Sequence, residues 1–502
     1  MAEAAISSKR KWGGLAVLSL ALAIVVIDQT LINVSLRTIV KDLHTTVHSL
    51  QWVITGYALV LSAFTIAGGR LGDLFGRKRM FMLGAVIFAC GAITAATAPN
   101  VTQLLLGASI IEGLGAALML PATSSLILAN FRGHERAIAF GVWGGTAGAA
   151  ASVGPLVGGY LTTYYSWRYG YGINLGIVTV LLLFSWLVTD SRENLRKPEI
   201  DFVGIFLSAL GLASVVYGVV QSSVDGWYRP KDPANLFGHV VNLGNHSEVP
   251  FVIAFGIMIL IIFVLWEAIV GLRGKTPLVS LRMFTNGPFV AGIITMGVVA
   301  MGQFGAIFAL PVFFQAARGL DAFHTGLAFL PFTLAAFFAA PISGFLSSKH
   351  LPPKYLVVTG LIIDAVGLYM VHNGLTATAT AATLRLPLLV FGIGFGMAFA
   401  QIANLTLSAV NVQQAGEASG LNNTFRQLGA TFGNAVIGSV LISTLMANYS
   451  ADIQSSTVLP AQLKPSIQAG AETAVQSLGQ SSAVGNSGGR PVPPAITAEL
   501  TR

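Results

Sequence analysis

Four ionisable side chains lie inside long apolar stretches of the sequence: Asp28, Glu112, Asp364 and Arg426. A charge inside a bilayer costs about 2.5–3.5 kcal/mol on insertion scales, so residues of this kind are usually retained for a function. A carboxyl group there can carry a proton or neutralise a cationic ligand. A guanidinium stays charged and must be paired or hydrated. These residue types therefore indicate movement of protons or ions rather than bond cleavage.

The surroundings of two acids favour a role in proton coupling. Asp28 lies in IDQTLINVSL, five residues before Asn33, and Glu112 lies in SIIEGLGAALMLP, among small residues that allow close helix packing. Either acid could instead be structural: Asp28 in a polar cluster with Thr30 and Asn33, and Glu112 as a neutral, hydrogen-bonded acid. For Asp364, pairing with a neighbouring helix is the favoured interpretation.

Arg426 follows LNNT and precedes QLGA in a polar part of an apolar segment. It could pair with a facing carboxylate and be released when substrate binds, although a gate or packing role fits equally well. Together with Asp28 and Glu112 it forms the predicted proton-coupling set. Glu267 lies near the end of its apolar segment and is expected to reach the membrane interface.

The segment GGRLGDLFGRKR is the strongest local signal. Its glycines permit a tight turn between helices, and an acid lies between two arginines with which it could pair to latch one face of a bundle. Retention of positive charge on one side of a membrane explains the basic residues but not the acid or the glycines. The predicted gate loop consists of Gly69, Arg70, Gly72, Asp73, Gly76 and Arg77.

A second glycine-rich segment, GVWGGTAGAAASVGPLVGGYL, carries a proline that should bend its helix. Its key residues are Gly154, Pro155, Gly158 and Gly159. No GK[ST] follows, so a phosphate-binding loop is excluded. The sequence contains no HExxH and no CxxC pair, and its single cysteine is Cys90, so neither a metal nor another cofactor is expected.

The elements that must position these residues follow from composition. Of the 502 residues, 54% are apolar and 10% are charged, and the mean hydropathy is +0.74. These values exclude a soluble globular enzyme, a disordered chain and a coiled coil, and they predict an all-α, polytopic membrane protein. The net charge of +8 is then interpreted as positive charge on the cytoplasmic side of a bilayer, not as a nucleic-acid surface.

Apolar segments long enough to span a bilayer predict thirteen helices. They lie near residues 13–36, 50–69, 80–97, 103–128, 137–162, 171–189, 202–221, 250–271, 287–312, 323–347, 355–372, 383–410 and 418–447. Lys and Arg concentrate in alternate connections, which places the amino terminus in the cytoplasm.

The expected organisation is two bundles separated by two linking helices, with a weak internal repeat between GGRLGDLFGRKRMF and SGFLSSKHLPPKYL. Residues 1–12 form a cytoplasmic segment, 13–190 a six-helix bundle, 191–285 the linking helices and loops, and 286–447 the second bundle. Residues 448–502 are expected to be a polar external loop or tail. The symmetry predicts a fourteenth helix beyond it, so a truncated chain and a natural flexible tail are both open.

Several of these segments resemble signatures of one family. GGRLGDLFGRKR resembles the loop between helices 2 and 3 of the major facilitator superfamily, and SVGPLVGG resembles the helix 5 motif of its drug exporters. IDQTLINVSL, QWVITGYAL and LNNTFRQLGA resemble signatures of its fourteen-helix drug:proton antiporter branch, and DFVGIFLSALGL and PLVSLRMF resemble its linking region. The resemblance covers residues 13 to about 447.

The resemblance implies a two-bundle transporter that exports substrates by alternating access, driven by protons. By position, Asp28 would be the helix 1 acid, Asp73 the gate acid, and Gln315 a polar residue facing the cavity. Gly154 and Pro155 would limit proton leak. The branch usually has Arg–x–x–Gln–Gly in helix 4, but this sequence has Ser109, Glu112 and Gly113 at those positions. Glu112 is therefore expected to take over part of the proton route.

The sequence thus predicts a multi-pass plasma-membrane antiporter, not an enzyme, that exports hydrophobic or cationic drugs or antibiotics. Its expected partners are a small-molecule substrate, protons and the lipid bilayer, with no nucleic acid and a monomeric state. An exporter of a lipid or of one endogenous metabolite, and a membrane sensor or scaffold without transport, remain alternatives. The expected substrate cavity includes Asn33, Trp52, Tyr57 and Gln315.

Overall fold

The computed structural model describes residues 8–45, 47–190, 200–228, 235–236, 239–240, 247–349, 351–376, 379–455 and 464. Residues 1–7, the charged linking segment 191–199, most of the loop between the two linking helices, and the tail after residue 455 apart from Lys464 lie outside the described residues. The part that is described is almost entirely helical, which confirms the predicted all-α class. Its exception is one antiparallel pair of two-residue strands, β1 (Asn235–Leu236) and β2 (His239–Val240).

The first group of helices runs to residue 187 and contains one helix interrupted by a π-helical turn. Its elements are α1 (Ser8–Asp42), α2 (Val47–Phe75), α3 (Arg77–Ala96), α4 (Val101–Leu104), the π-turn η1 (Leu105–Ile111), α5 (Glu112–Asn130), α6 (Gly133–Tyr164), α7 (Arg168–Leu183) and the 3-10 turn η2 (Ser185–Leu187).

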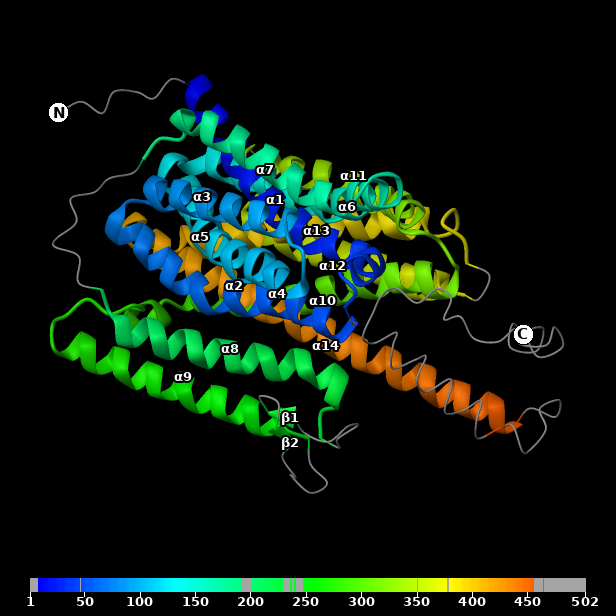
Figure 1. Cartoon of the computed structure of the whole chain (residues 1–502). Helices are drawn as coiled ribbons and strands as arrows, with labels where there is room; N and C mark the ends of the chain where they lie inside the picture. Colours follow the sequence, from blue (N-terminus) through cyan, green and yellow to red (C-terminus); the bar gives the residue numbers. More distant parts are fainter. Residues whose placement is uncertain are drawn as a thin grey trace.

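Two long helices follow, α8 (Phe202–Asp225) and α9 (Val249–Leu272), in the region that the sequence predicts to link two bundles; they are called here the linking helices. The second group comprises the 3-10 turn η3 (Leu281–Thr285), α10 (Gly287–Val312), the π-turn η4 (Phe313–Ala317), α11 (Ala322–Lys349), α12 (Pro353–Gly374), α13 (Arg385–Ser408), the 3-10 turn η5 (Val412–Gln414) and α14 (Ala415–Ser455). In Figure 1, α8 and α9 lie together along one edge, and α14 extends past the other helices.

Each of the thirteen predicted segments coincides with a helix, but not every one of these helices is long and apolar enough to cross a membrane. Within the described residues, eleven helices are long and apolar enough to cross a membrane. The segment predicted over 171–189 is shorter than expected, because α7 has 16 residues and ends before the turn at Phe184. The last segment is longer than expected, since α14 has 41 residues.

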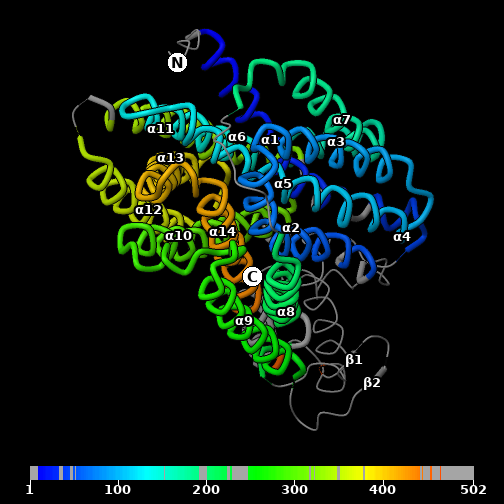
Figure 2. The backbone as a smooth tube through the Cα atoms, turned by 90° about the vertical axis from the view of Figure 1, so that its left-hand side faces the viewer, coloured from blue at the N-terminus to red at the C-terminus, as the bar shows by residue number. Residues whose placement is uncertain are grey.

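Glycines allow helices of the two groups to pack closely where the groups meet. Figure 2 shows α1–α7 on one side and α10–α14 on the other. A Cβ added to Gly141 of α6 would lie 2.6 Å from the Ala340 carbonyl oxygen of α11, and one added to Gly69 of α2 would lie 2.3 Å from the Gly416 carbonyl oxygen of α14. Such backbone contacts are possible only without side chains, so these helix pairs form two close seams between the groups.

The linking helices pack against both groups. Trp52 of α2 stacks on Tyr217 of α8 with 5.7 Å between ring centroids, and Val215 and Val219 of α8 cluster with Ala435 of α14. Figure 2 accordingly places α8 beside α2 and α14, with α9 on the outside. The linking pair therefore lies across the boundary instead of standing apart from it.

Candidate functional site

An amide joins the two acids that the sequence singled out. The Asn174 Nδ2 of α7 donates to Asp28 Oδ1 at 2.7 Å and to Glu112 Oε1 at 3.5 Å. Glu112 and Asn174 are fully buried and Asp28 is 6% exposed. Because one amide carries two N–H groups, it can hold both carboxyl groups at once. The acids therefore form one site, called here the acid pair.

Local backbone features bring the acid pair together. Glu112 follows directly on the π-turn η1, which widens the helix just before this residue; such turns recur at functional sites. A Cβ on Gly91 of α3 would lie 2.6 Å from the Glu112 Cγ, so only glycine leaves room for that side chain. A Cβ on Gly154 of α6 would collide with the Thr30 Oγ1 of α1 at 1.8 Å. These contacts fix α1 and α5 around the site.

The polar cluster suggested by the sequence has a different composition. The Thr30 hydroxyl donates to the carbonyls of Val26 and Ile27 in its own helix, not to Asp28. The side chain of Asn33 lies outside the described residues. Two buried tyrosines, Tyr57 of α2 and Tyr171 of α7, lie within electrostatic range of both acids.

Arg426 lies on the opposite side of the boundary between the groups. It is 6% exposed, and its Nη2 donates to Asn423 Oδ1 at 3.4 Å. Its guanidinium carbon lies 6.0 Å from the centre of the Phe399 ring. Among the described residues no carboxylate lies within 4.0 Å of it, while Tyr57 is within electrostatic range. Arg426 and the acid pair thus both approach Tyr57.

The predicted gate loop connects the two groups through hydrogen bonds. Arg77 donates to Asp73 Oδ1 through Nε at 3.0 Å and Nη2 at 2.8 Å, and Nη2 also donates to the Val412 carbonyl. Asp73 in turn accepts from the backbone amides of Gly416 at 3.0 Å and Glu417 at 2.9 Å. Because these amides begin α14, the carboxylate caps the positive end of a helix in the other group. This end of the molecule is called the gate end.

The three glycines of the gate loop have different roles. Gly69 permits the close approach to Gly416 described above, and Gly76 has φ +102°, a backbone conformation that favours glycine. A Cβ on Gly72 would meet no neighbour closer than 3.8 Å, so this position has room for a side chain. The requirement for glycine therefore falls on Gly69 and Gly76.

The linking segment is tied to the gate end by a second acidic group. Glu417 accepts from the Ser280 amide and lies 4.0 Å from the Arg70 guanidinium. Burial raises the pKa of the Glu417 carboxyl to about 7, since Arg70 only partly offsets the loss of solvation. Glu267 does not reach the interface as expected: it is 1% exposed and accepts from the Val279 amide at 3.2 Å. The buried segment before η3 supplies the donor that keeps it inside.

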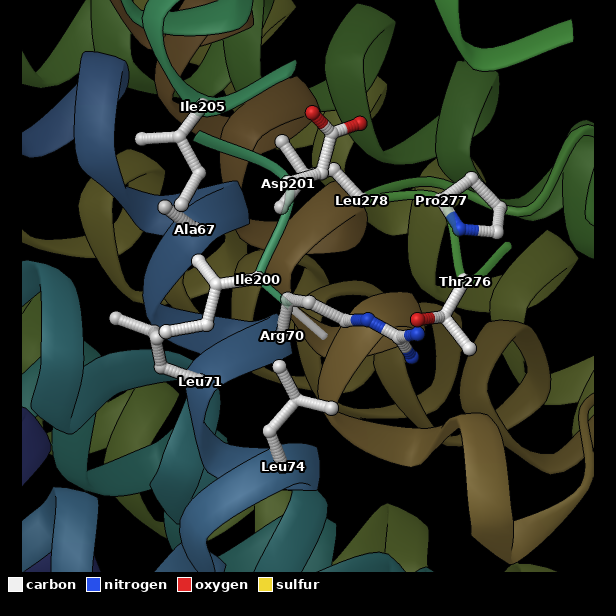
Figure 3. Close-up of a pocket in the computed structure, with 10 residues that line it drawn as sticks. All are labelled: Ala67, Arg70, Leu71, Leu74, Ile200, Asp201, Ile205, Thr276, Pro277 and Leu278. Carbon is white, nitrogen blue, oxygen red and sulfur yellow. The ribbon is translucent and has the colours of Figure 1, made fainter. Parts of the chain in front are cut away.

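A pocket at the gate end lies between α2, the start of α8 and residues 276–278. Figure 3 shows the Arg70 guanidinium reaching toward Thr276 across it. Its cavity volume of about 10 Å³ is far below the range of about 300–1,000 Å³ that is usual for drug-sized ligands. The acid pair contributes no residue to its lining.

The remaining predicted residues have varied positions. Trp52 is 37% exposed and stacks on the linking helix α8. Gln315 is half-buried in the π-turn η4, and no hydrogen bond joins it to the acid pair within the described residues. Pro155 lies inside α6 and is half-buried. Gly158, against Leu31 of α1, and Gly159 are both buried.

Sequence reasoning missed Asn174 and Glu417. Asn174 lies in the apolar segment YGINLGIV. Because a buried amide requires hydrogen-bond partners, its presence there could have indicated a polar site. Glu417 begins a helix just ahead of a predicted span, and its role depends on contacts with α2 that no local pattern shows. Asp364 pairs with a neighbouring helix as expected, accepting from Gln303 Nε2 of α10 at 3.3 Å.

Comparison with known proteins identifies the family. One family description matches residues 18–434, which run from α1 into α14. The chain belongs to the Major Facilitator Superfamily. Membership of the Major Facilitator Superfamily makes it a multi-pass membrane transporter and not an enzyme.

Its curated relatives in the Major Facilitator Superfamily include drug resistance and export proteins. The chain is 30% identical to the multidrug efflux pump LfrA of Mycolicibacterium smegmatis over 481 residues, covering 95% of this chain and 87% of the relative. It is 30% identical to the puromycin resistance protein pur8 of Streptomyces alboniger (88% and 84% covered). It is 27% identical to the tetracenomycin C resistance and export protein of Streptomyces glaucescens (86% and 76% covered).

Solved structures of two transporters share the fold. The human organic anion transporter MFSD10 matches with a TM-score of 0.56 and 12% identity, covering 93% of this chain and 99% of that one. The proton:xylose symporter XylE matches with a TM-score of 0.58 and 14% identity, covering 94% and 95%. At these identities the comparison establishes the arrangement of helices alone.

Proposed function

We propose that this chain is a proton-coupled antiporter that exports hydrophobic or cationic drug-like molecules from the cytoplasm by alternating access. The observation that carries the proposal is the bridge from Asn174 to Asp28 and Glu112. Two carboxylates that share one amide repel each other, which favours a proton on the pair. A buried site that gains and loses a proton is what coupling to a proton gradient requires. The names of the relatives support export of drugs or antibiotics.

In the proposed cycle the acid pair takes up a proton when it faces the exterior and releases it when it faces the cytoplasm. Substrate moves in the opposite direction. Tyr57 lies within electrostatic range of both the acid pair and Arg426, so a change of charge on the acids can be felt across the boundary between the groups. Arg426 is the proposed group that responds to this change.

The gate end is the proposed cytoplasmic side, and in the proposed cycle the contact of Asp73 with the start of α14 keeps it closed. Opening requires the Asp73 carboxylate to leave the amides of Gly416 and Glu417. Gly154 and its neighbours keep α6 against α1 during this movement, which limits proton leak past the acid pair.

The organisation proposed for this activity is that of two bundles, 13–190 and 286–447, joined by a linking region, 191–285. The transporter acts as a monomer in the plasma membrane with its amino terminus in the cytoplasm. Support comes from arginines at the gate end: Arg70 lies beside Glu417, Arg77 donates to the Val412 carbonyl and Arg136 donates to Ser408.

The proposal is tested in everted membrane vesicles whose interior has been acidified. Ethidium, rhodamine 6G and puromycin are added in turn, and a quenched dye reports the pH gradient. Wild-type vesicles should lose part of the gradient on addition of a substrate, and Asp28→Asn and Glu112→Gln should abolish that response. Asp321→Asn, which neutralises an exposed acid, is the matched control.

Absence of any response with inserted wild-type protein would contradict polyspecific drug antiport. A response confined to a lipid or to one metabolite would support the narrower exporter. A protein that binds ligands without moving protons would support a sensor.

A further inference from the structure

A group of hydrogen-bond donors and aromatic rings lies where the two groups of helices meet. Trp143 of α6 stacks on Phe399 of α13 across the boundary, with 6.3 Å between ring centroids and 21° between planes. Phe399 continues the stack to Phe395 at 5.7 Å and 6°. Arg426 of α14 lies beside the same Phe399 ring. Trp143, Phe399 and Arg426 are called here the boundary cluster.

The boundary cluster has more donors than acceptors. The Trp143 Nε1 and the Arg426 Nε are both buried and have no hydrogen-bond partner among the described residues. The one hydrogen bond that Arg426 makes there, to Asn423 Oδ1, is long at 3.4 Å. A buried guanidinium without a carboxylate is costly, because its desolvation is not offset by a partner. A ligand that supplies an acceptor would remove this cost.

The geometry also specifies the shape of the ligand. Trp143 belongs to one group and Phe399 to the other, so separation of the groups exposes the two ring faces toward each other. A planar aromatic molecule can stack on either face, and a carboxylate or phenolate on its edge can then reach the Arg426 fork. A cationic ligand at the same place would face the charge of Arg426.

We infer that the boundary cluster binds planar aromatic substrates that carry an acidic group, a carboxylate or a phenolate, held by Arg426 and stacked on Phe399. This rests on the proposed function for its transport step and adds acidic aromatic molecules, bound at the boundary cluster, to the hydrophobic and cationic substrates proposed above. The acid pair remains the proton site, and Arg426 supplies the charge that the substrate recognises.

The test compares three probes that share one ring system: 9-anthracenecarboxylate, its methyl ester and 9-(aminomethyl)anthracene. Binding to the purified full chain in detergent is measured by equilibrium dialysis. Arg426→Gln should weaken binding of the carboxylate by about tenfold or more and leave the ester within about twofold, because only the carboxylate makes the charge-assisted contact. Trp143→Phe replaces the indole by a smaller aromatic ring without the N–H, so it should weaken binding of the carboxylate by a smaller factor.

Two controls separate this effect from misfolding and from general charge. Unchanged binding of the ester shows that Arg426→Gln still folds, and Arg385→Gln, which removes an exposed arginine at the start of α13, should change nothing. Equal weakening of carboxylate and ester, no selective loss, a preference for the amine, or no binding of any probe would each overturn the inference. Because dialysis requires no proton gradient, these outcomes are independent of the vesicle test.

Discussion

At the scale of single residues, Asn174 joins the two acids of the proposed proton site. Asp28 and Glu112 come from different helices, and the amide between them is the hydrogen-bond donor that both share. Without it, each carboxyl group would sit in an apolar environment with no donor to hold it near the other. Coupling between the acids should therefore depend on Asn174 even though it carries no charge.

Replacement of Asn174 by Leu, which is similar in size, should lower substrate-dependent proton movement in vesicles about tenfold or more, because it removes the donors and keeps the packing volume. The matched control is Thr179→Val on the exposed face of the same helix, where the hydroxyl bonds only to the Leu175 carbonyl. Equal activity of Asn174→Leu and wild type would show that the bridge is not needed.

Gly154→Ala should destabilise the protein by about 1–3 kcal/mol, the usual cost of overpacking, since its Cβ would lie 1.8 Å from Thr30 Oγ1. A Cβ added to Gly302 in α10 would have no neighbour within 4 Å, so Gly302→Ala should leave the stability of the protein unchanged or raise it slightly. Thermal unfolding of the purified variants measures both. A melting temperature for Gly154→Ala equal to that of wild type would be inconsistent with the close contact of α1 and α6.

The sequence predicted the residues of this site that carry charge, and missed the neutral residue that joins them. Asp28 and Glu112 stand out because charge is rare in apolar segments. Asn174 gives a weaker signal, and its two partners are set by the π-turn before Glu112 and by Gly91, which are features of packing rather than of local pattern.

At the scale of elements, the contact between α2 and α14 holds the two groups together at the gate end. Asp73 caps the first amides of α14, and Gly69 and Gly416 allow the backbones to meet. The residues that make this contact lie at the end of α2 and the start of α14. The bounds of helices are harder to predict from sequence than their existence. The sequence placed α2 and α3 around a tight turn, but it could not show that the acid of the turn caps a helix more than three hundred residues away.

Gly69→Ala should open the gate end, because its Cβ would push the start of α14 away from Asp73. Gly72→Ala is the matched control in the same loop, with 3.8 Å to its nearest neighbour. Spin labels at the exposed Phe75 and Gln413, in a background without Cys90, report the distance across the gate. Identical distance distributions for the two variants would argue against this role of Gly69.

Closure of the gate should also depend on pH through Glu417. Burial raises the pKa of this carboxyl to about 7 in the closed arrangement, from an ordinary value of 4.5 when it reaches water. The closed arrangement therefore binds the proton more tightly, so acidification from pH 8 through pH 7 toward 4.5 should favour closure.

The same label pair measures this effect as the open fraction at pH 8 and pH 5.5. The charged groups that face Glu417 are Arg70 and Asp73 of the gate loop and Glu267 of α9, so Glu417→Gln is needed to assign the effect. The gate end of the Glu417→Gln variant should stay closed at both pH 8 and pH 5.5. A pH response that persists unchanged in Glu417→Gln would place the titrating group elsewhere.

At the scale of the whole molecule, two groups of helices meet along glycine-lined seams, and a linking pair lies across their boundary. Apolar segment lengths predicted nearly all of the helices, because bilayer thickness fixes them. The position of α8 against both α2 and α14 could not be predicted, since it follows from side-chain packing between segments far apart in the chain. The family comparison then identified the assembly as a transporter.

Substrate and proton are proposed to exchange at the acid pair, so binding of substrate should release a proton from it. Purified protein in weakly buffered detergent solution is mixed with the panel compound that gives the largest vesicle response, while a pH dye records released protons. Wild type and Asp321→Asn should release about one proton per chain or less, as expected for a coupled pair of acids. The double variant Asp28→Asn/Glu112→Gln should bind the compound and release none. Undiminished release from the double variant would contradict exchange of substrate and proton at the acid pair.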